Sequence, residues 1–473
     1  MAYDEKTVRD VTRHILRALS GEDHPAGSPV PQESGCLFEQ VNDAVEAAWR
    51  AQKELVRTSL AKRSQIIENI RKRCRENVER LSRMEVEETG MGCYEDKVVK
   101  HTLTIDGTPG IEDIQTQAVS GDNGLMLVEQ RPFGVGGCIL PSTAPSCTAI
   151  HNSICMIASG NGAVLSPHPG ALKTTLEALR IIHEAIVEAG GPGGIITSTC
   201  AATMENANAL MRHPKVTFLL ATGGPGVVKA VLTSGKKAIA AGPGNPPVLV
   251  DETADIEKAA REIIMGNSFE NCLQCIGEKE VFAVNCIADD LIRAMIENGG
   301  YLIEDARLID RLTALVTDAD GHPNKQYVGK SASVILRDLG ITPPNGVRTI
   351  IFEANDTHPI VVEEYLMPLL PIVRVKNVRE GIDKAVAAEG GNRHSAMVHS
   401  HNVVTLTRYA QELQTTILVK NGPSYAGLGL GGEGYVTMSL AGPTGEGLTS
   451  PRTFTRAQRC SMIGELNLRT AMR

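Results

Sequence analysis

The chain has 473 residues, of which 42% are hydrophobic and 22% are charged, and its net charge at pH 7 is -8. This length allows two or three domains with substantial cores, because single cores stop growing well before it. The acidic balance argues against nucleic acid as a partner. Since no apolar run reaches about 18 residues, no membrane span is expected.

The first 20 residues have the pattern of an amphipathic helix. Val8, Ile15 and Leu19 lie on one apolar stripe, with charged residues around the rest. Residues 21–35 are rich in proline and glycine and are typical of a flexible linker. Because a tethered helix with an apolar face needs a surface to cover that face, we predict that residues 1–20 are a docking peptide. The alternative is a helix that folds back onto its own domain or onto an oligomer partner.

From Leu37 the chain changes to long helical patterns and then to short apolar strands. Apolar stripes over 41–49 and 66–81 each predict a helix. Strand-like runs such as 136–140 and 216–220 then alternate with helical stretches. This alternation predicts an α/β fold in which a parallel sheet is covered on both faces. Ligands of such sheets bind beyond the carboxyl ends of the strands.

Three connecting segments stand out in this region. The strand-like run 125–128 is either an arm that pairs with another subunit or half of an ordinary hairpin. The loop 141–145 follows a predicted strand, and the loop 222–226 follows another and opens a helix at Val227. This last loop offers free N–H groups and a helix dipole to a phosphate, although a tight structural turn is an equally good interpretation.

The most informative stretch contains Cys272 and Cys275. A helical stripe with Asp255 as its N-cap and Gly266 as its stop precedes it, and a strand over 281–284 follows, so the cysteines are expected on a loop. A Cys-x-x-Cys loop is half of a zinc site, a dithiol redox pair, or one nucleophilic thiol with a bystander. A zinc site needs a second pair at similar spacing, which the sequence lacks, so no metal is expected.

The other cysteines are scattered and form no spaced framework. This distribution among 11 cysteines fits a reducing cytosol better than secretion. Most of them lie within apolar periodic stretches and are expected to be small buried hydrophobic residues, for example Cys74, Cys138, Cys155 and Cys286.

Taken together, these motifs resemble the aldehyde dehydrogenase superfamily. More narrowly, the sequence is similar to the coenzyme A-acylating aldehyde dehydrogenases of the ethanolamine and propanediol type in bacterial microcompartments. The resemblance covers essentially the whole chain, and its matching stretches are 88–92, 121–125, 141–145, 166–169, 242–247, 420–423 and 442–447. So many matches in order are far more specific than any one of them.

The resemblance implies an aldehyde dehydrogenase fold of the α/β class. A Rossmann-like domain for NAD and coenzyme A is expected over 36–246, with an oligomerisation arm near 122–132. A catalytic α/β domain is expected over 247–440, and the segment 441–473 is expected to return to the cofactor domain or the oligomer interface. The family further implies a homodimer or homotetramer. It also implies a microcompartment lumen in the bacterial cytoplasm as the location, with residues 1–20 docking on a shell or cargo protein.

In that family the nucleophile is the cysteine followed by two residues and a glutamate, which here is Cys275 with Glu278. Cys275 is expected to form a thiohemiacetal and, after hydride loss to NAD⁺, a thioester, with its own N–H as oxyanion donor. Thr143 stands where hydrolytic members carry an asparagine donor, so its hydroxyl either helps or only packs. Cys272 replaces a small polar residue, and it is either an inert neighbour or the partner of an inactivating disulfide.

The resemblance also assigns the cofactor residues. The pyrophosphate is expected against Thr222, Gly223 and Gly224, with Gly242 nearby. The adenosine ribose is expected against Ser166, Pro167 and His168. Glu364 matches the glutamate that holds the nicotinamide ribose, with a solvated surface acid as the alternative. His394 matches a family histidine whose role stays open.

One absence points to the product. Hydrolytic members activate water with a glutamate at the position of Ala240, and no carboxylate is present there. Water has a pKa near 16, whereas a thiol with a pKa of about 8.5 needs far less help to attack a thioester. We therefore expect coenzyme A to accept the acyl group of a short-chain aldehyde, acetaldehyde or propionaldehyde. The alternatives are a non-acylating semialdehyde dehydrogenase and a non-catalytic scaffold protein.

Overall fold

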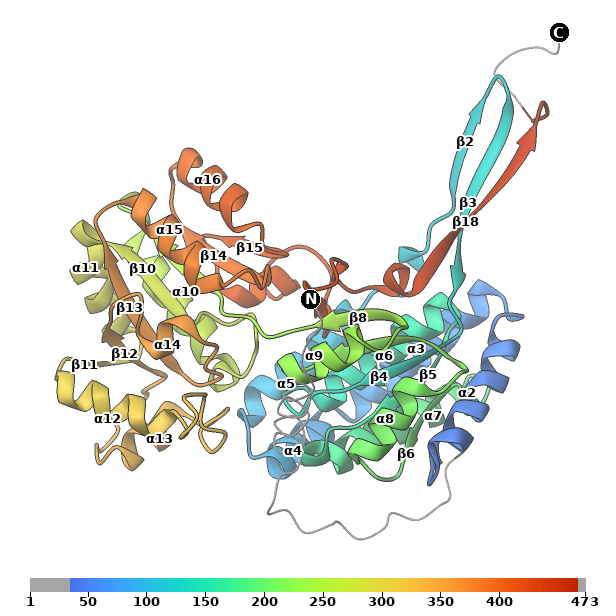
Figure 1. Cartoon of the computed structure of the whole chain (residues 1–473), viewed down its shortest axis with the longest axis horizontal. Helices are drawn as coiled ribbons and strands as arrows, with labels where there is room; N and C mark the ends of the chain where they lie inside the picture. The colour runs from blue at the N-terminus through green and yellow to red at the C-terminus, as the bar shows by residue number, and fades with distance from the viewer. Residues whose placement is uncertain (1–34, 467–473) are drawn as a thin grey trace, which may run out of the picture.

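The computed structural model describes residues 35–466. The expected docking helix over 1–20, and all but the last residue of the linker over 21–35, lie outside the described residues. The described chain forms two α/β lobes and a long arm that projects from the first lobe (Figure 1). No helix in this part of the chain has both the length and the apolar character needed to cross a bilayer.

The first lobe contains a six-stranded parallel sheet, which confirms the predicted architecture. Its edge-to-edge order is β1 (Leu37–Phe38), β6 (Ile196–Thr199), β5 (Gly162–Ser166), β4 (Val135–Ile139), β7 (Val216–Thr222) and β8 (Lys237–Ala241). Every residue of β5 is buried, as expected for a central strand covered on both faces.

Helices cover the faces of this sheet (Figure 1). The helices of this lobe are α2 (Val41–Leu55), α3 (Leu60–Glu76), α4 (Val78–Thr89), α5 (Tyr94–Gly107), α6 (Pro145–Ser159), α7 (Leu172–Glu188), α8 (Met204–Arg212) and α9 (Pro225–Leu232). Among them, α3, α4 and α5 pack against α6 or α7. The prediction of a single helix over 66–81 is wrong, because the helix is interrupted at Asn77. That residue leaves helical geometry, and its Nδ2 donates to the carbonyl of Arg73 at 2.9 Å. An asparagine favours such local bonds over the helix ladder.

The second lobe contains a seven-stranded parallel sheet. Its order is β11 (Gly300–Ile303), β12 (Thr349–Glu353), β13 (Leu369–Val375), β10 (Glu280–Val284), β9 (Pro247–Val250), β14 (Ser395–His399) and β15 (Ile417–Lys420). The helices around it are α10 (Ile256–Ser268), α11 (Asn285–Glu297), α12 (Ala306–Val316), α13 (Ala332–Asp338), α14 (Pro359–Val362), α15 (Val378–Glu389) and α16 (Val403–Leu413).

Helix α10 begins where its sequence predicts but ends later. Asp255 caps it as predicted, with its Oδ1 accepting from the N–H of Lys258 at 3.1 Å. Gly266 does not stop it, because the helix continues to Ser268. A Cβ at Gly266 would lie 2.1 Å from a carboxylate oxygen of Glu278. The glycine therefore provides room for a buried carboxylate rather than a helix end.

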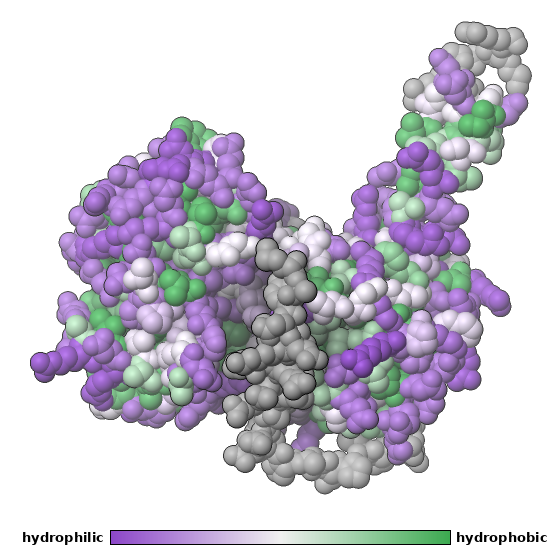
Figure 2. All heavy atoms as spheres, viewed as in Figure 1, coloured by the Kyte–Doolittle hydropathy of each residue, from purple (hydrophilic) through white to green (hydrophobic). Residues whose placement is uncertain are grey.

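The arm is a three-stranded antiparallel sheet that carries apolar side chains away from the lobes (Figure 2). It consists of β2 (Gln117–Gly121), β3 (Gly124–Pro132) and β18 (Thr455–Ile463), with β3 in the centre. Val119 is 58% exposed and Ile463 is 78% exposed. Residues 125–128 therefore belong to a hairpin formed by β2 and β3, and the C-terminal strand β18 pairs with the other edge of β3. Pairing of the arm with another subunit stays a prediction.

The cysteine expectations are confirmed in three cases. Cys74, Cys138 and Cys155 are buried and carry no disulfide. Cys286 is exposed, so its assignment to the core is wrong. It occupies the first turn of α11, whose buried face is made by Ala288, Leu291, Ile292, Ala294 and Met295 instead.

Candidate active site

The candidate site lies where the carboxyl ends of the first sheet meet segments that lead into strands of the second. The contact runs through Gly244, in the linker between β8 and β9. Its N–H donates to Glu364 Oε1 at 3.2 Å. A Cβ at this glycine would lie 2.6 Å from the ring of His394 and 2.8 Å from the carbonyl oxygen of Cys275. The linker therefore brings together three of the residues singled out from the sequence.

Cys275 lies on a loop between a 3₁₀ turn, η3 (Phe269–Cys272), and β10, and part of it is exposed. Burial raises the pKa of its thiol to about 12, and the charge of Glu364 acts in the same direction. Lys279 and the backbone N–H groups of Cys275 and Ile276 oppose this rise in pKa. The protein alone thus keeps the thiol protonated near neutral pH while holding donors beside the sulfur.

Alkylation should report this state directly. Iodoacetamide reacts with the thiolate, so we expect Cys275 in the cofactor-free enzyme to react slowly at pH 7. The rate should rise about tenfold per pH unit up to pH 9, since the pKa lies above this range. Added NAD⁺ should accelerate it, because a positive nicotinamide favours the thiolate. Peptide mapping by mass spectrometry gives the rate, and a plateau at pH 7 to 8 would contradict the protonated state.

Cys272 is a structural residue of the same loop. Its side chain is fully buried, and its Sγ accepts from Lys279 Nζ at 3.0 Å and from Asn267 Nδ2 at 3.4 Å. The same ammonium donates to the carbonyl of Gln274 at 3.0 Å. Three acceptors on one loop thus converge on a buried lysine, counting the carbonyl of Cys272 at 3.4 Å. The loop conformation depends on this lysine, to which sequence reasoning gave no role.

Glu278 also holds the nucleophile loop in place. Its two carboxylate oxygens accept from the N–H and the hydroxyl of Ser424, both at 2.8 Å. Burial raises the pKa of Glu278 to about 7, although these hydrogen bonds and Lys279 favour the charged form. With both oxygens bound to Ser424, the carboxylate ties the nucleophile loop to the chain after β15.

Thr143 is placed at the carboxyl end of β4, in the loop before α6. The side chain is partly exposed, and its hydroxyl makes no hydrogen bond within the described part of the chain. Its carbonyl accepts from Lys100 Nζ at 3.3 Å. The hydroxyl is therefore available to a ligand, and its role as an oxyanion donor stays a prediction.

The predicted cofactor residues gather on the same edge of the first sheet. Ser166 ends β5, where it pairs with Ile139 of β4, and Pro167 and His168 follow it. Thr222 ends β7, and the N–H of Gly223 donates to the carbonyl of Ala241 at 3.2 Å.

The turn after β7 has room for a ligand. Gly224 caps α9, and a Cβ there would meet no atom within 4 Å, so open space faces the start of the helix. Gly242 packs against Pro443 and Val228. This open helix N-terminus fits the pyrophosphate of a dinucleotide.

Glu364 faces the site, unlike its neighbour. Glu363 lies at the surface, where it pairs with His322 at 2.8 Å. Glu364 instead accepts from the N–H of Gly244, and burial raises its pKa to about 7 against the influence of Lys279. The structure thus contradicts the alternative of a solvated surface acid, while ribose binding stays a prediction.

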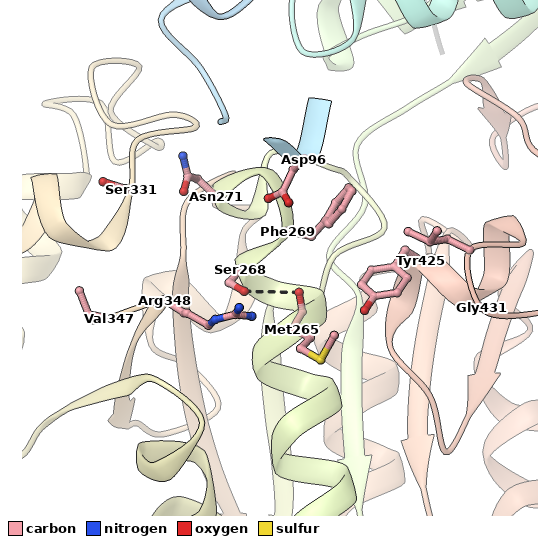
Figure 3. A pocket seen from close by; sticks show the side chains of 11 residues that line it. Asp96, Met265, Ser268, Phe269, Asn271, Ser331, Val347, Arg348, Tyr425 and Gly431 are labelled. Carbon is pink, nitrogen blue, oxygen red and sulfur yellow. Dashed lines mark hydrogen bonds between the residues drawn. The ribbon is translucent and has the colours of Figure 1, made fainter. Parts of the chain in front are cut away.

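A cavity of about 580 Å³ lies beside the nucleophile loop (Figure 3). Phe269 and Asn271 line it from the turn before Cys275, and Asp96 lines it from α5. The Phe269 ring packs on Tyr425, with ring centres 5.4 Å apart. Cys275 is not among the lining residues, so this cavity adjoins the reactive loop without enclosing its thiol.

Comparison with known proteins agrees with this geometry. The model of the aldehyde dehydrogenase family matches residues 25–434. A propanal dehydrogenase (CoA-propanoylating) of Salmonella typhimurium is 43% identical over 96% of this chain and 98% of its own length. An acetaldehyde dehydrogenase (acetylating) of the same organism is 40% identical over 97% of this chain and 98% of its own.

Solved structures agree as well. Rhodopseudomonas palustris propionaldehyde dehydrogenase, solved with bound CoA and an acylated cysteine, is 50% identical to this chain, with a TM-score of 0.91. The match covers 92% of this chain and 100% of the other chain. A propionaldehyde dehydrogenase from the fucose utilisation bacterial microcompartment of Clostridium phytofermentans has the same identity and coverage and a TM-score of 0.90. The chain therefore belongs to the aldehyde dehydrogenase family and, within it, to the CoA-acylating enzymes.

Proposed function

We propose that this protein oxidises a short-chain aldehyde, acetaldehyde or propionaldehyde, to its acyl-CoA with NAD⁺ as hydride acceptor, reversibly. The observation that carries the proposal is that the chain has a partly exposed cysteine at position 275 and an alanine, with no carboxylate, at position 240. Ala240 is fully buried in β8, and its N–H donates to the hydroxyl oxygen of Thr444 at 3.1 Å. The site therefore has a nucleophile for the aldehyde and no general base for water at that position.

In the oxidation step, the Cys275 thiol gives up its proton to solvent, and its sulfur then forms a bond to the carbonyl carbon so that the aldehyde oxygen becomes negative. The backbone N–H of Cys275 and the hydroxyl of Thr143 stabilise that oxygen. Thr222–Gly224, Gly242, Ser166–His168 and Glu364 would hold NAD⁺, which would accept the hydride. Loss of the hydride leaves an acyl group on Cys275 as a thioester.

In the transfer step, the sulfur of coenzyme A bonds to the thioester carbon, the bond to Cys275 Sγ breaks, and the proton of the coenzyme A thiol passes to the leaving Cys275 thiolate. His394 is suited to accept a hydrogen bond from the incoming S–H. Its Nδ1 is paired with Ser395 Oγ at 2.8 Å, while its buried Nε2 has no partner among the described residues. Burial lowers the pKa of His394 to about 3, so the ring is neutral and Nε2 is free to accept a hydrogen bond.

The likeness to a microcompartment enzyme supports the remaining assignments. The docking peptide over 1–20 would attach the enzyme to a shell or cargo protein, inside a microcompartment lumen in the bacterial cytoplasm. The arm would join subunits into a homodimer or homotetramer through its exposed apolar residues, among them Val119 and Ile463.

The direct test is the product formed in ample coenzyme A. With propionaldehyde or acetaldehyde and NAD⁺, we expect NADH and acyl-CoA in equal amounts, measured by absorbance and by mass spectrometry. Free carboxylic acid in place of acyl-CoA would instead support a non-acylating semialdehyde-type dehydrogenase. No NADH from either aldehyde would support a scaffold.

A further inference from the structure

Four charged side chains are buried together where the two lobes meet. Glu85, Lys97, Lys100 and Glu270 have side chains at most 3% exposed. Lys97 Nζ lies 2.7 Å from Glu85 and 2.9 Å from Glu270. Lys100 Nζ lies 2.6 Å from Glu270 and 3.6 Å from Glu85. Burial would raise the pKa of Glu85, but the lysines bring it down to about 2, so its carboxylate stays charged.

Stability alone does not explain this cluster. Taking ions out of water costs about as much as their mutual attraction returns, so well-packed apolar side chains would stabilise the fold at least as well. A buried ion cluster does favour one arrangement of the segments that carry it. Here those segments are α4 and α5 of the first lobe and the turn η3 of the second.

Glu270 holds the turn that leads to the nucleophile. Three successive residues of this turn have positive φ angles of 51°, 57° and 58°: Glu270, Asn271 and Cys272. Residues with a side chain adopt such a run only where their surroundings enforce it. The carboxylate of Glu270 is held by both lysines, and its N–H donates to Asp96 Oδ2 at 2.8 Å. The turn ends three residues before Cys275, so these contacts fix where the nucleophile loop begins.

Lys100 reaches the opposite side of the site as well. Its Nζ donates to the carbonyl of Thr143 at 3.3 Å, in addition to binding Glu270. Lys97 Nζ binds Glu85 and Glu270 but, among the described residues, makes no hydrogen bond to the Thr143 loop. The two lysines therefore share one cluster and differ in this contact, which gives a matched pair for experiment.

We propose that Lys100 is a positioning residue for aldehyde oxidation, joining the Glu270 turn to the Thr143 loop and so setting how far the Thr143 hydroxyl lies from the Cys275 N–H. Both donors must reach one oxygen, and a displacement of about 1 Å costs about 10²-fold in rate. The inference rests on the proposed function, because it uses these two groups as the oxyanion donors. Lys100 itself does not touch the aldehyde.

The test is the first-turnover rate, measured as the NADH burst with aldehyde and NAD⁺ and without coenzyme A. Lys100→Met is expected to slow the burst about 10- to 100-fold in the parent, but less than about twofold in a Thr143→Ala background. Lys97→Met, the matched control, removes a charge from the same cluster and should slow both backgrounds equally. The KM for NAD⁺ should not change in Lys100→Met.

A Lys100→Met enzyme with the parent burst rate, or with the same loss in both backgrounds, would overturn the proposal. Lys100→Met could fail to fold because Glu270 loses a partner. In that case the double variant Lys100→Met/Glu270→Gln, which removes one positive and one negative charge together, takes its place in the same comparison. Failure of the proposed function is distinguishable, because the burst reports only aldehyde oxidation. The acyl acceptor is read from the product in ample coenzyme A.

Discussion

Replacing Cys275 with alanine is expected to lower turnover at least ~10³-fold, because the acyl group then has no atom of the enzyme on which to form. The fold should be retained, since the side chain is partly exposed and Cys275 makes no disulfide. The measurement is NADH formation at saturating aldehyde, NAD⁺ and coenzyme A, together with a melting curve for the variant. Turnover at the parent rate would remove the basis of the proposed reaction.

Cys272→Ser is the matched control for this substitution. A serine hydroxyl at 272 can still accept from Lys279, as the thiol does at 3.0 Å. We expect this variant to stay within about tenfold of the parent, because it changes loop packing and not the nucleophile. Equal losses in both variants would instead favour the dithiol interpretation of the Cys-x-x-Cys loop.

The regular elements of this protein were largely predictable because their apolar residues repeat at helical or strand spacing. The exceptions are local. At Asn77 the apolar stripe continues from α3 into α4, so spacing alone does not reveal the break. At position 266 a glycine is needed because a side chain there would overlap the Glu278 carboxylate, which is twelve residues away in sequence and adjacent in space. Neither fact has a signal in the surrounding residues.

The residues of the candidate site also fall into those that sequence motifs predicted and those that they did not. Loop residues such as Thr143 and Glu364 were singled out through motifs, because they lie in recognisable strings. The supporting charges were not found. Lys97 and Lys100 lie three residues apart on α5, a spacing that usually marks a solvated helix face, yet both are buried. Their partner Glu270 comes from the other lobe, so only the three-dimensional fold shows that these charges are compensated.

Coenzyme A should be required for repeated turnover. Without it we expect one equivalent of NADH per subunit and then a rate at least ~10²-fold slower, because water, with a pKa near 16, has no base to activate it. Two acidic side chains of the Cys275 loop are otherwise engaged. Both oxygens of Glu270 bind lysines and both oxygens of Glu278 bind Ser424.

Glu364 is the carboxyl group that needs a control in this experiment. Its pKa of about 7, raised by burial, leaves it partly ionised at neutral pH, and Gly244 occupies Oε1. If Glu364 activates water slowly, Glu364→Gln will lower the residual rate after the burst without lowering the burst amplitude. Stopped-flow absorbance gives both quantities, and mass spectrometry should find the acyl group on the peptide that contains Cys275. Continued NADH formation at the full rate without coenzyme A would show that water takes the acyl group readily and that the alanine at position 240 does not decide the product.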